Sequence, residues 1–350
     1  MTSSNAPHQP HVEFYTRNGL AGPAASVHRD QYTPPYTRVR GSYAPHRVNL
    51  NHLADDVWHE RRGLPVPVLG GQGVSIESSW RIEPMPFALR NVTADELHFV
   101  LRGSARLETD FGVLDLRAGD FVLLPRAVTY RLTAITQALQ EIIVVSDEAL
   151  AFRTDDRPRV LDTRRHVDIP APQGSPAVVE DEFELVIRHG RELTSYFYDY
   201  DPMACLKTDG EPVVRRFNLR DVHQSAVGTG GAALPVCLLA DDGELARLYS
   251  VGGRGLERPQ IHRNADYDEV ILYTAGPGAF GAVNQAGTML WTPKGITQQG
   301  PESEPGKSFQ AWMLETRSPL TLTPAGREVA RLMETGHFSL HKQPKRNPLL

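Results

Sequence analysis

Apolar residues after position 96 occur in short runs, with Gly, Asp and other turn residues between them. The runs of the first half are 97–101, 105–109, 112–116, 120–125, 129–133 and 141–146, and those of the second are 183–188, 194–198, 234–240, 245–250, 269–274, 279–284, 287–291 and 309–315. Runs of this length at spacings of about ten residues are typical of antiparallel strands in a sandwich or barrel. The pattern therefore predicts an all-β fold.

One helix is expected, near the C-terminus. Thr323 supplies a capping hydroxyl, Pro324 suits the first turn, and Gly336 is placed to end the helix after AGREVARLMET. The first 75 residues show little periodicity and many Pro, Gly and aromatic residues, which indicates an irregular arm packed on another surface.

An internal repeat organises the middle of the chain. LRNVTADE (89–96) and HRNADYDE (262–269) match at Arg, Asn, Asp and Glu, and each runs into an apolar segment. Each is followed by a Gly six residues before a Pro, at 119–125 and 287–293. Such self-similarity indicates a duplicated β-unit. The predicted segments are an arm (1–75), a first β domain (76–153), a linker (154–182), a second β domain (183–322), and a helix with its tail (323–350).

Composition and charge exclude several classes of protein. The 350 residues carry 37 Lys and Arg against 42 Asp and Glu, a net charge of −5, so no basic excess attracts nucleic acid or anionic membrane. No apolar stretch is long enough to span a bilayer, and the N-terminus lacks a signal-peptide core. Cys205 and Cys237 form no disulfide or zinc framework. We expect a cytoplasmic protein.

Both halves resemble the cupin pattern, whose motifs read His-x-His-x(3,4)-Glu and Gly-x5-Pro-x-Gly-x2-His. In that barrel the two histidines, the glutamate and the last histidine bind one metal. Here the second half supplies, in those four slots, His262, Asn264, Glu269 and Gln298. The first half supplies Leu89, Asn91, Glu96 and Tyr130. The resemblance implies a bicupin whose first barrel is structural and metal-free.

A closer resemblance, over roughly residues 30–322, is to homogentisate 1,2-dioxygenase. It is carried by TPPYTRVRGSYAPHRV, TDFGVLDLRAGDFVLLPRAVTYRL, RPQIHRN, QQGPE and AWMLETRSPLTL. The resemblance implies an Fe(II) enzyme that opens the ring of 2,5-dihydroxyphenylacetate with O2 to give maleylacetoacetate. It also implies a homo-oligomer, with the arm as a packing element.

The metal ligands leave alternatives open. The family binds iron with His, Glu and His, and His262 matches cleanly. The carboxylate is Glu269 by cupin spacing or Asp268 by family spacing, and only one of them can point inward because neighbouring strand residues face opposite sides. The final histidine is replaced by Gln298 when counted from the proline, or by Gln299 from the local match to QQGPE. An amide oxygen is a weaker ligand than imidazole, so Mn(II) or no metal are alternatives to Fe(II).

Other residues are candidates for contact with a small aromatic substrate. Arg263, Asn264 and Tyr267 follow the first ligand and could meet a substrate carboxylate or hydroxyl. His223 is the nearest counterpart of the family's histidine base. Three functions remain open: a ring-cleaving dioxygenase, another bicupin enzyme acting on an aromatic or quinone with altered or lost metal, and a non-catalytic small-molecule-binding bicupin.

Overall fold

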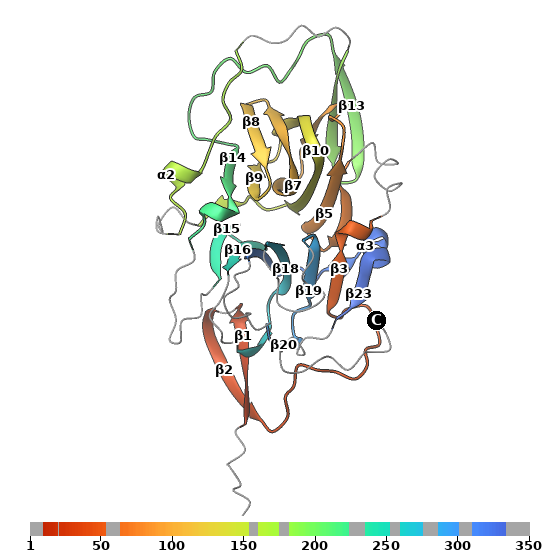
Figure 1. Cartoon of the computed structure of the whole chain (residues 1–350), viewed down its shortest axis with the longest axis vertical. Helices are drawn as coiled ribbons and strands as arrows, with labels where there is room; N and C mark the ends of the chain where they lie inside the picture. The colour runs from red at the N-terminus through yellow and green to blue at the C-terminus, as the bar shows by residue number, and fades with distance from the viewer. Residues whose placement is uncertain are drawn as a thin grey trace, which may run out of the picture.

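The structure is a computed structural model that describes residues 10–19, 21–53, 64–153, 160–174, 182–223, 235–252, 260–275, 286–300 and 310–333. Within these residues the fold is almost entirely β, as the alternating apolar runs predicted, and it consists of two β-units stacked along the long axis (Figure 1). The run 279–284 lies outside the described residues. No helix in the described part of the chain is long and apolar enough to cross a membrane.

The first unit is built on one curled, mainly antiparallel 11-stranded sheet. Its strands are β4 (Val66–Gly70), β5 (Val74–Arg81), β6 (Ala88–Asn91), β7 (Asp95–Thr109), β8 (Gly112–Arg117), β9 (Asp120–Leu124), β10 (Thr129–Ser146), β12 (Phe183–His189), β13 (Glu192–Tyr198), β14 (Arg215–Asn218) and β22 (Thr321–Leu322). The long strands β7 and β10 pair with each other through most of their length and form the spine of this unit.

The second unit combines an 8-stranded and a 4-stranded sheet. The larger sheet contains β3 (His46–Asn49), β11 (Ala151–Phe152), β15 (Val236–Ala240), β16 (Ala246–Gly252), β18 (Asp268–Ala275), β19 (Thr288–Thr292), β21 (Gln310–Thr316) and β23 (Ala330–Leu332). The smaller sheet contains β1 (His11–Asn18), β2 (Ala21–Arg29), β17 (Ile261–Asn264) and β20 (Thr297–Gln298). Figure 1 shows the smaller sheet at the end of the molecule remote from β13.

The two units share strands in a way that the local pattern did not show. The N-terminal segment is not only an irregular arm, because it supplies β1, β2 and β3 to the second unit. Residues 183–218, which the sequence division assigned to the second domain, instead pair with β6 and β9 of the first. Periodicity identifies a strand but not its partner, which depends on contacts between distant segments.

The described residues contain two short α-helices and two single-turn 3-10 helices, η1 (Leu50–His52) and η2 (Leu219–Asp221). In α3 (Pro324–Val329) the Thr323 hydroxyl accepts a hydrogen bond from the Gly326 N–H at 3.0 Å, as the predicted N-cap requires. The helix ends before the expected Gly336, which lies outside the described residues, because residues 330–332 pair with β3 as β23. The other helix, α2 (Thr163–His166), lies in the segment that was expected to be a linker and was not predicted.

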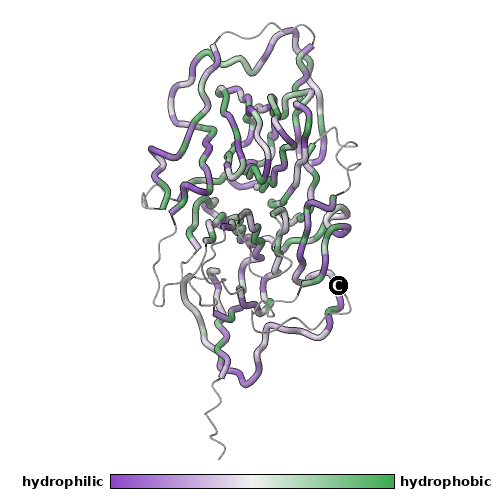
Figure 2. Tube along the Cα trace, viewed as in Figure 1, coloured by the Kyte–Doolittle hydropathy of each residue, from purple (hydrophilic) through white to green (hydrophobic). Residues whose placement is uncertain are grey.

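A shared core joins the two units. Trp312 of β21 packs its ring 5.8 Å from that of Phe99 and 6.0 Å from that of Phe121, both in the first unit. Figure 2 shows apolar segments along the strands where the units meet. Residues at alternate positions of the same strands face away from this core, so each unit has an interior of its own.

The sequence repeat corresponds to a structural repeat. Asp95 and Asp268 occupy the same position, and each carboxylate accepts hydrogen bonds from two distant backbone N–H groups. The donors are Arg126 at 2.9 Å and Leu150 at 2.9 Å in the first unit, and Lys294 at 3.1 Å and Leu320 at 2.9 Å in the second. The aspartate therefore fastens the start of a strand to the turn after Pro125 or Pro293 in both copies.

Candidate metal and substrate site

The interior of the second unit contains the candidate site. Alternate residues of its strands form a small apolar cluster of Val251, Tyr273, Leu290, Ala311 and Met313. Glu269 and Glu315 follow the same alternation on β18 and β21, so they face this interior and not the shared core. Both side chains are buried.

Strands β17 and β20 place His262 directly opposite Gln298. The His262 Nδ1 atom lies 3.0 Å from the Gln260 carbonyl oxygen, so it carries the proton and donates it. The Nε2 atom is then a lone-pair acceptor and lies 3.3 Å from the Gln298 Nε2 atom. A backbone carbonyl that fixes the tautomer in this way is the usual support of a metal-binding histidine.

Asn264 connects this histidine to the carboxylates. It lies two residues after His262, hence on the same face of β17, and its Nδ2 atom is 3.5 Å from Glu315 Oε1. Glu315 pairs directly with Glu269 across β18 and β21. An imidazole, two amides and two carboxylates therefore line one interior.

The two carboxylates create an excess of negative charge. Burial, with the repulsion of Glu269, raises the pKa of Glu315 to about 7. Tyr249 and Arg247 oppose this rise in the pKa. Within the described residues no hydrogen bond reaches the Glu315 Oε2 atom, and the Nη1 atom of Arg247 is 4.0 Å away from it. Sequence reasoning missed Glu315, although it lies in the AWMLETRSPLTL segment. Its importance arises from its cross-strand register with Glu269.

These donors fit a divalent cation in their chemistry. Carboxylate oxygens and an imidazole lone pair suit Fe(II) or Mn(II), and no donor in the described part of the chain hydrogen-bonds the buried Glu315 Oε2 atom. The described residues contain no group of three His, Cys, Asp or Glu side chains arranged to hold a metal ion. A cation bound by His262 and Glu269 would therefore depend on the Gln298 amide to complete its ligands.

Asp268, the alternative to Glu269, has a different environment. Its side chain is completely buried and accepts hydrogen bonds from Tyr43 Oη at 2.7 Å and Trp291 Nε1 at 2.9 Å, besides the two backbone N–H groups described above. Burial and the Asp268 carboxylate raise the pKa of Tyr43 well above its usual range. Four donors occupy the oxygens of Asp268, so of the two carboxylates the geometry favours Glu269 as the ligand.

Gln299 and Arg263 point toward the N-terminal segment. Gln299 accepts a hydrogen bond from Tyr32 Oη at 2.7 Å, whereas its neighbour Gln298 faces His262. Arg263 forms an ion pair with Glu13 at 3.3 Å. These contacts secure β17 and β20 to β1 and to the chain that follows β2, and they place both side chains apart from the Glu269–Glu315 pair.

Tyr267 and His223 are not brought to the His262 face. The Tyr267 ring lies 4.6 Å from the guanidinium of Arg247 and 5.2 Å from that of Arg317, and its hydroxyl is 3.1 Å from Glu244. The Tyr267 side chain is therefore held by two guanidinium groups and one carboxylate. His223 is exposed on the segment after β14.

The first unit has a different polar interior at the equivalent position. Glu96 accepts hydrogen bonds from Asn91 Nδ2 at 2.8 Å and Tyr130 Oη at 2.9 Å, and it lies 3.2 Å from His98 Nε2. The other ring nitrogen of His98 is 3.1 Å from Glu141 Oε1. Burial opposes charge on this ring, but the two carboxylates outweigh it and raise the pKa of His98 to about 9. Glu96 is therefore engaged by internal partners.

We expect this buried imidazolium to make stability depend on pH. In the unfolded chain His98 loses its proton near pH 6.5, whereas in the folded protein it keeps the proton to about pH 9. Its contribution is therefore complete below pH 6.5 and is lost as pH rises to about 9. Urea unfolding across this range should show the decline. His98→Gln should show a shallower one, and parallel declines in the two proteins would contradict the assignment.

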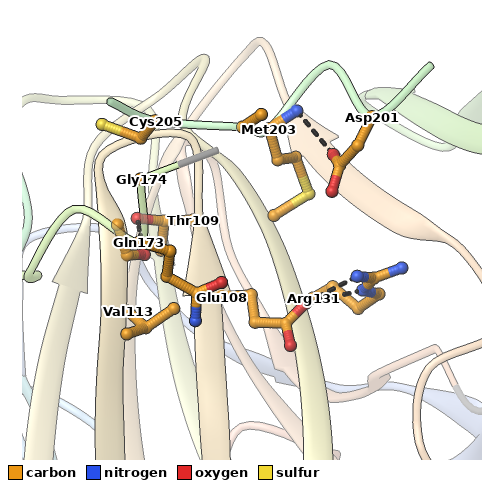
Figure 3. A pocket seen from close by; sticks show the side chains of 11 residues that line it. Glu108, Thr109, Val113, Arg131, Gln173, Gly174, Asp201, Met203 and Cys205 are labelled. Atoms are coloured by element: carbon orange, nitrogen blue, oxygen red, sulfur yellow. Dashed lines mark hydrogen bonds and ion pairs between the residues drawn. The ribbon is translucent and has the colours of Figure 1, made fainter. Parts of the chain in front are cut away.

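A separate cavity of about 120 Å³ opens on the first unit, and none of the predicted site residues lines it (Figure 3). The two charged strand residues that line the cavity form an ion pair, in which Arg131 donates a hydrogen bond to Glu108 at 2.6 Å. Cys205 and Met203 lie across from this pair in Figure 3. The cavity shares no residue with the His262 interior.

Comparisons with known proteins show remote similarity. No protein-family model matches the chain. A Saccharolobus solfataricus protein named as a "putative dioxygenase" is 22% identical over 200 residues, which are 53% of this chain and 51% of that protein. The chain thus spans about half the length of the curated relative it matches.

Solved structures with a similar chain path have low sequence identity. A cupin 2 conserved barrel domain protein from Leptotrichia buccalis is 11% identical with a TM-score of 0.46, covering 80% of this chain and 100% of that one. A salicylate 1,2-dioxygenase from Pseudaminobacter salicylatoxidans is 10% identical with a TM-score of 0.46, covering 81% and 89%.

Proposed function

We propose that the protein is a cupin-type dioxygenase that cleaves a small dihydroxylated aromatic acid with O2, of the homogentisate 1,2-dioxygenase type. The observation that carries the proposal is the second interior. There His262 presents a lone pair of fixed orientation to Gln298, and Asn264 on the same face of β17 contacts Glu315 of the Glu269–Glu315 pair. The name of the Saccharolobus solfataricus relative supports the reaction class. The resemblance of the sequence to homogentisate 1,2-dioxygenase supports the substrate class.

In this proposal His262, Glu269 and Gln298 would hold Fe(II), which would supply the Lewis-acid and redox chemistry for the reaction of the substrate with O2. The protein's own part is positioning. The Gln260 carbonyl orients the His262 ring, and Asn264 orients Glu315 beside Glu269. Asn264 is the proposed substrate-contact residue that shares the face of His262, whereas Arg263 and Tyr267 are engaged by Glu13 and Glu244.

The proposal is tested by metal content and oxygen uptake. Protein purified without chelator should contain iron, or take it up anaerobically to about one ion per chain. The iron-loaded protein should consume O2 with homogentisate. Gentisate is the matched control, because it carries a different acidic substituent on the same dihydroxylated ring. Iron-loaded protein that consumes no O2 with either acid would overturn the proposed substrate class. Failure to bind iron would overturn the proposed site.

A second candidate function rests on Gln298. A neutral amide in the slot of the family's last histidine, with no ready three-residue metal group among the described residues, favours a bicupin that acts on another aromatic or quinone with altered or lost metal. A non-catalytic small-molecule-binding bicupin is the limiting case. Tight binding of aromatic acids by metal-free protein, with no O2 consumption, is the result that these alternatives predict.

Replacing Gln298 with His is expected to raise affinity for Fe(II) by about tenfold or more, because imidazole is a better donor than a carboxamide for this ion. Anaerobic competition with a chelator measures the change. Gln299→His is the matched control, since that side chain bonds Tyr32 on the other face. If only Gln299→His raised the affinity for Fe(II), Gln299 would be the residue in the position of the family's last histidine. If neither substitution raised the affinity for Fe(II), the second candidate function would be favoured.

A further inference from the structure

The β12–β13 hairpin presents an unprotected sheet edge. Strand β13 is the last in the order of its sheet, and among the described residues it pairs only with β12. Figure 1 shows it at the outer margin of the first unit, far from β17 and β20. Its sequence ELTSYFY contains no Lys or Pro, the residues that commonly guard an edge against pairing.

Large apolar side chains are exposed on this strand. The exposed fraction is 49% for Leu193, 51% for Tyr196 and 58% for Phe197, and the strand is exposed on both faces. Tyr200, just beyond it, is 57% exposed. Isolated exposed apolar residues are ordinary, but a contiguous group on an open edge marks an interaction surface.

The hairpin register determines which backbone groups point outward. His189 pairs with Glu192 across a two-residue turn, so hydrogen bonds to β12 come from alternate residues beginning with Glu192. The residues between them, Leu193, Ser195 and Phe197, direct their N–H and C=O groups to the open edge. Consistent with this, the Arg188 carbonyl opposite Leu193 points away from β13 and accepts a hydrogen bond from Val92.

The open edge is complementary to itself. In an antiparallel pair centred on Ser195, Leu193 lies opposite Phe197 of the partner subunit, and all three outward residues form hydrogen-bonded pairs that exchange two N–H···O bonds each. Arg191 lies in the turn just before β13 and Asp199 just after it, so each end of this pairing brings Arg191 near Asp199 of the partner subunit, and both residues are exposed. Backbone, apolar and charged groups thus select one register.

We propose that two copies of this chain associate through their β13 strands, related by a twofold axis at Ser195, so that the sheets of the two first units become continuous. A twofold interface requires a surface that is complementary to itself, and the pairing of Leu193 with Phe197 and of Arg191 with Asp199 meets that condition. The occupant of the edge is therefore a second copy of this chain.

Sedimentation equilibrium of the full chain over a range of concentrations tests the interface. The wild type should form a dimer or a multiple of it. Arg191→Asp and Asp199→Arg should each weaken association by about tenfold or more, because each places like charges opposite one another. The double variant restores opposite charges and should associate within about threefold of wild type.

Two further variants separate the interface from folding. Ser195→Pro removes an outward N–H group and no backbone bond to β12. The one bond to β12 that it removes is the exposed hydrogen bond from the Ser195 hydroxyl to Glu184 at 2.7 Å, so it should give a monomer with nearly unchanged thermal unfolding of the subunit. Ile82→Ser, at a residue 68% exposed outside the hairpin, is the control and should associate like the wild type. A wild type that is monomeric at every concentration would overturn the proposal. So would a dimer indifferent to Ser195→Pro, or a double variant as weak as the single ones.

Discussion

His262→Ala is expected to abolish metal binding and to leave the fold nearly intact. The substitution removes an imidazole whose proton is fixed on Nδ1 by the Gln260 carbonyl, which leaves Nε2 as the atom that can bind a metal. Loss of a residue that merely supports a metal ligand costs about 10–100-fold in affinity, and loss of the ligand itself should exceed that. The two hydrogen bonds lost, with the Gln260 carbonyl and the Gln298 amide, are each worth only about 1 kcal/mol of unfolding free energy.

Elemental analysis and chemical denaturation of the same preparation measure both effects. His223→Ala is the matched control for metal content, because that histidine is exposed and its ring lies beside that of His166. A His262→Ala protein with the metal content and turnover of the wild type would show that the site lies elsewhere. Reduced metal content together with a large loss of stability would instead indicate that His262 supports the fold of the second unit.

The repeat was the most informative feature of the sequence. Asp95 and Asp268 match in sequence, and in the structure each accepts hydrogen bonds from two backbone N–H groups at equivalent positions of its own copy. This aspartate recurs in both copies, including the first copy, which has Leu89 in place of His262. Its recurrence there indicates a structural function. Leu89 and His262 differ at another position of the same motif, and that difference identified the candidate site.

The remaining features depend on pairings that no local pattern encodes. Glu315 joins the site because β21 pairs with β18 in a register that places it opposite Glu269. Similarly, Glu141 holds His98 from 43 residues away in the chain. The strands before residue 53 form because β17 and β19 offer open edges to them. Sequence spacing could predict these strands or side chains one at a time, but not their partners.

Asp268→Ala is expected to destabilise the protein by about 3–5 kcal/mol, whereas a substitution of its neighbour Glu269 is expected to change stability little. The aspartate joins four donors that are far apart in sequence, the Tyr43 hydroxyl, the Trp291 indole and the backbone N–H groups of residues 294 and 320. Alanine would leave buried donors without an acceptor, and each such group costs about 1–3 kcal/mol.

Glu269→Gln is the matched comparison, because it removes a charge on the opposite face of the same strand. It relieves the repulsion that acts on Glu315, so unfolding free energy should stay within about 1 kcal/mol of wild type or rise, while metal affinity falls. Urea denaturation and metal content together separate the two residues. If Asp268→Ala loses metal without losing stability, the family spacing identified the ligand correctly and the four hydrogen bonds of Asp268 are secondary to a role in the site.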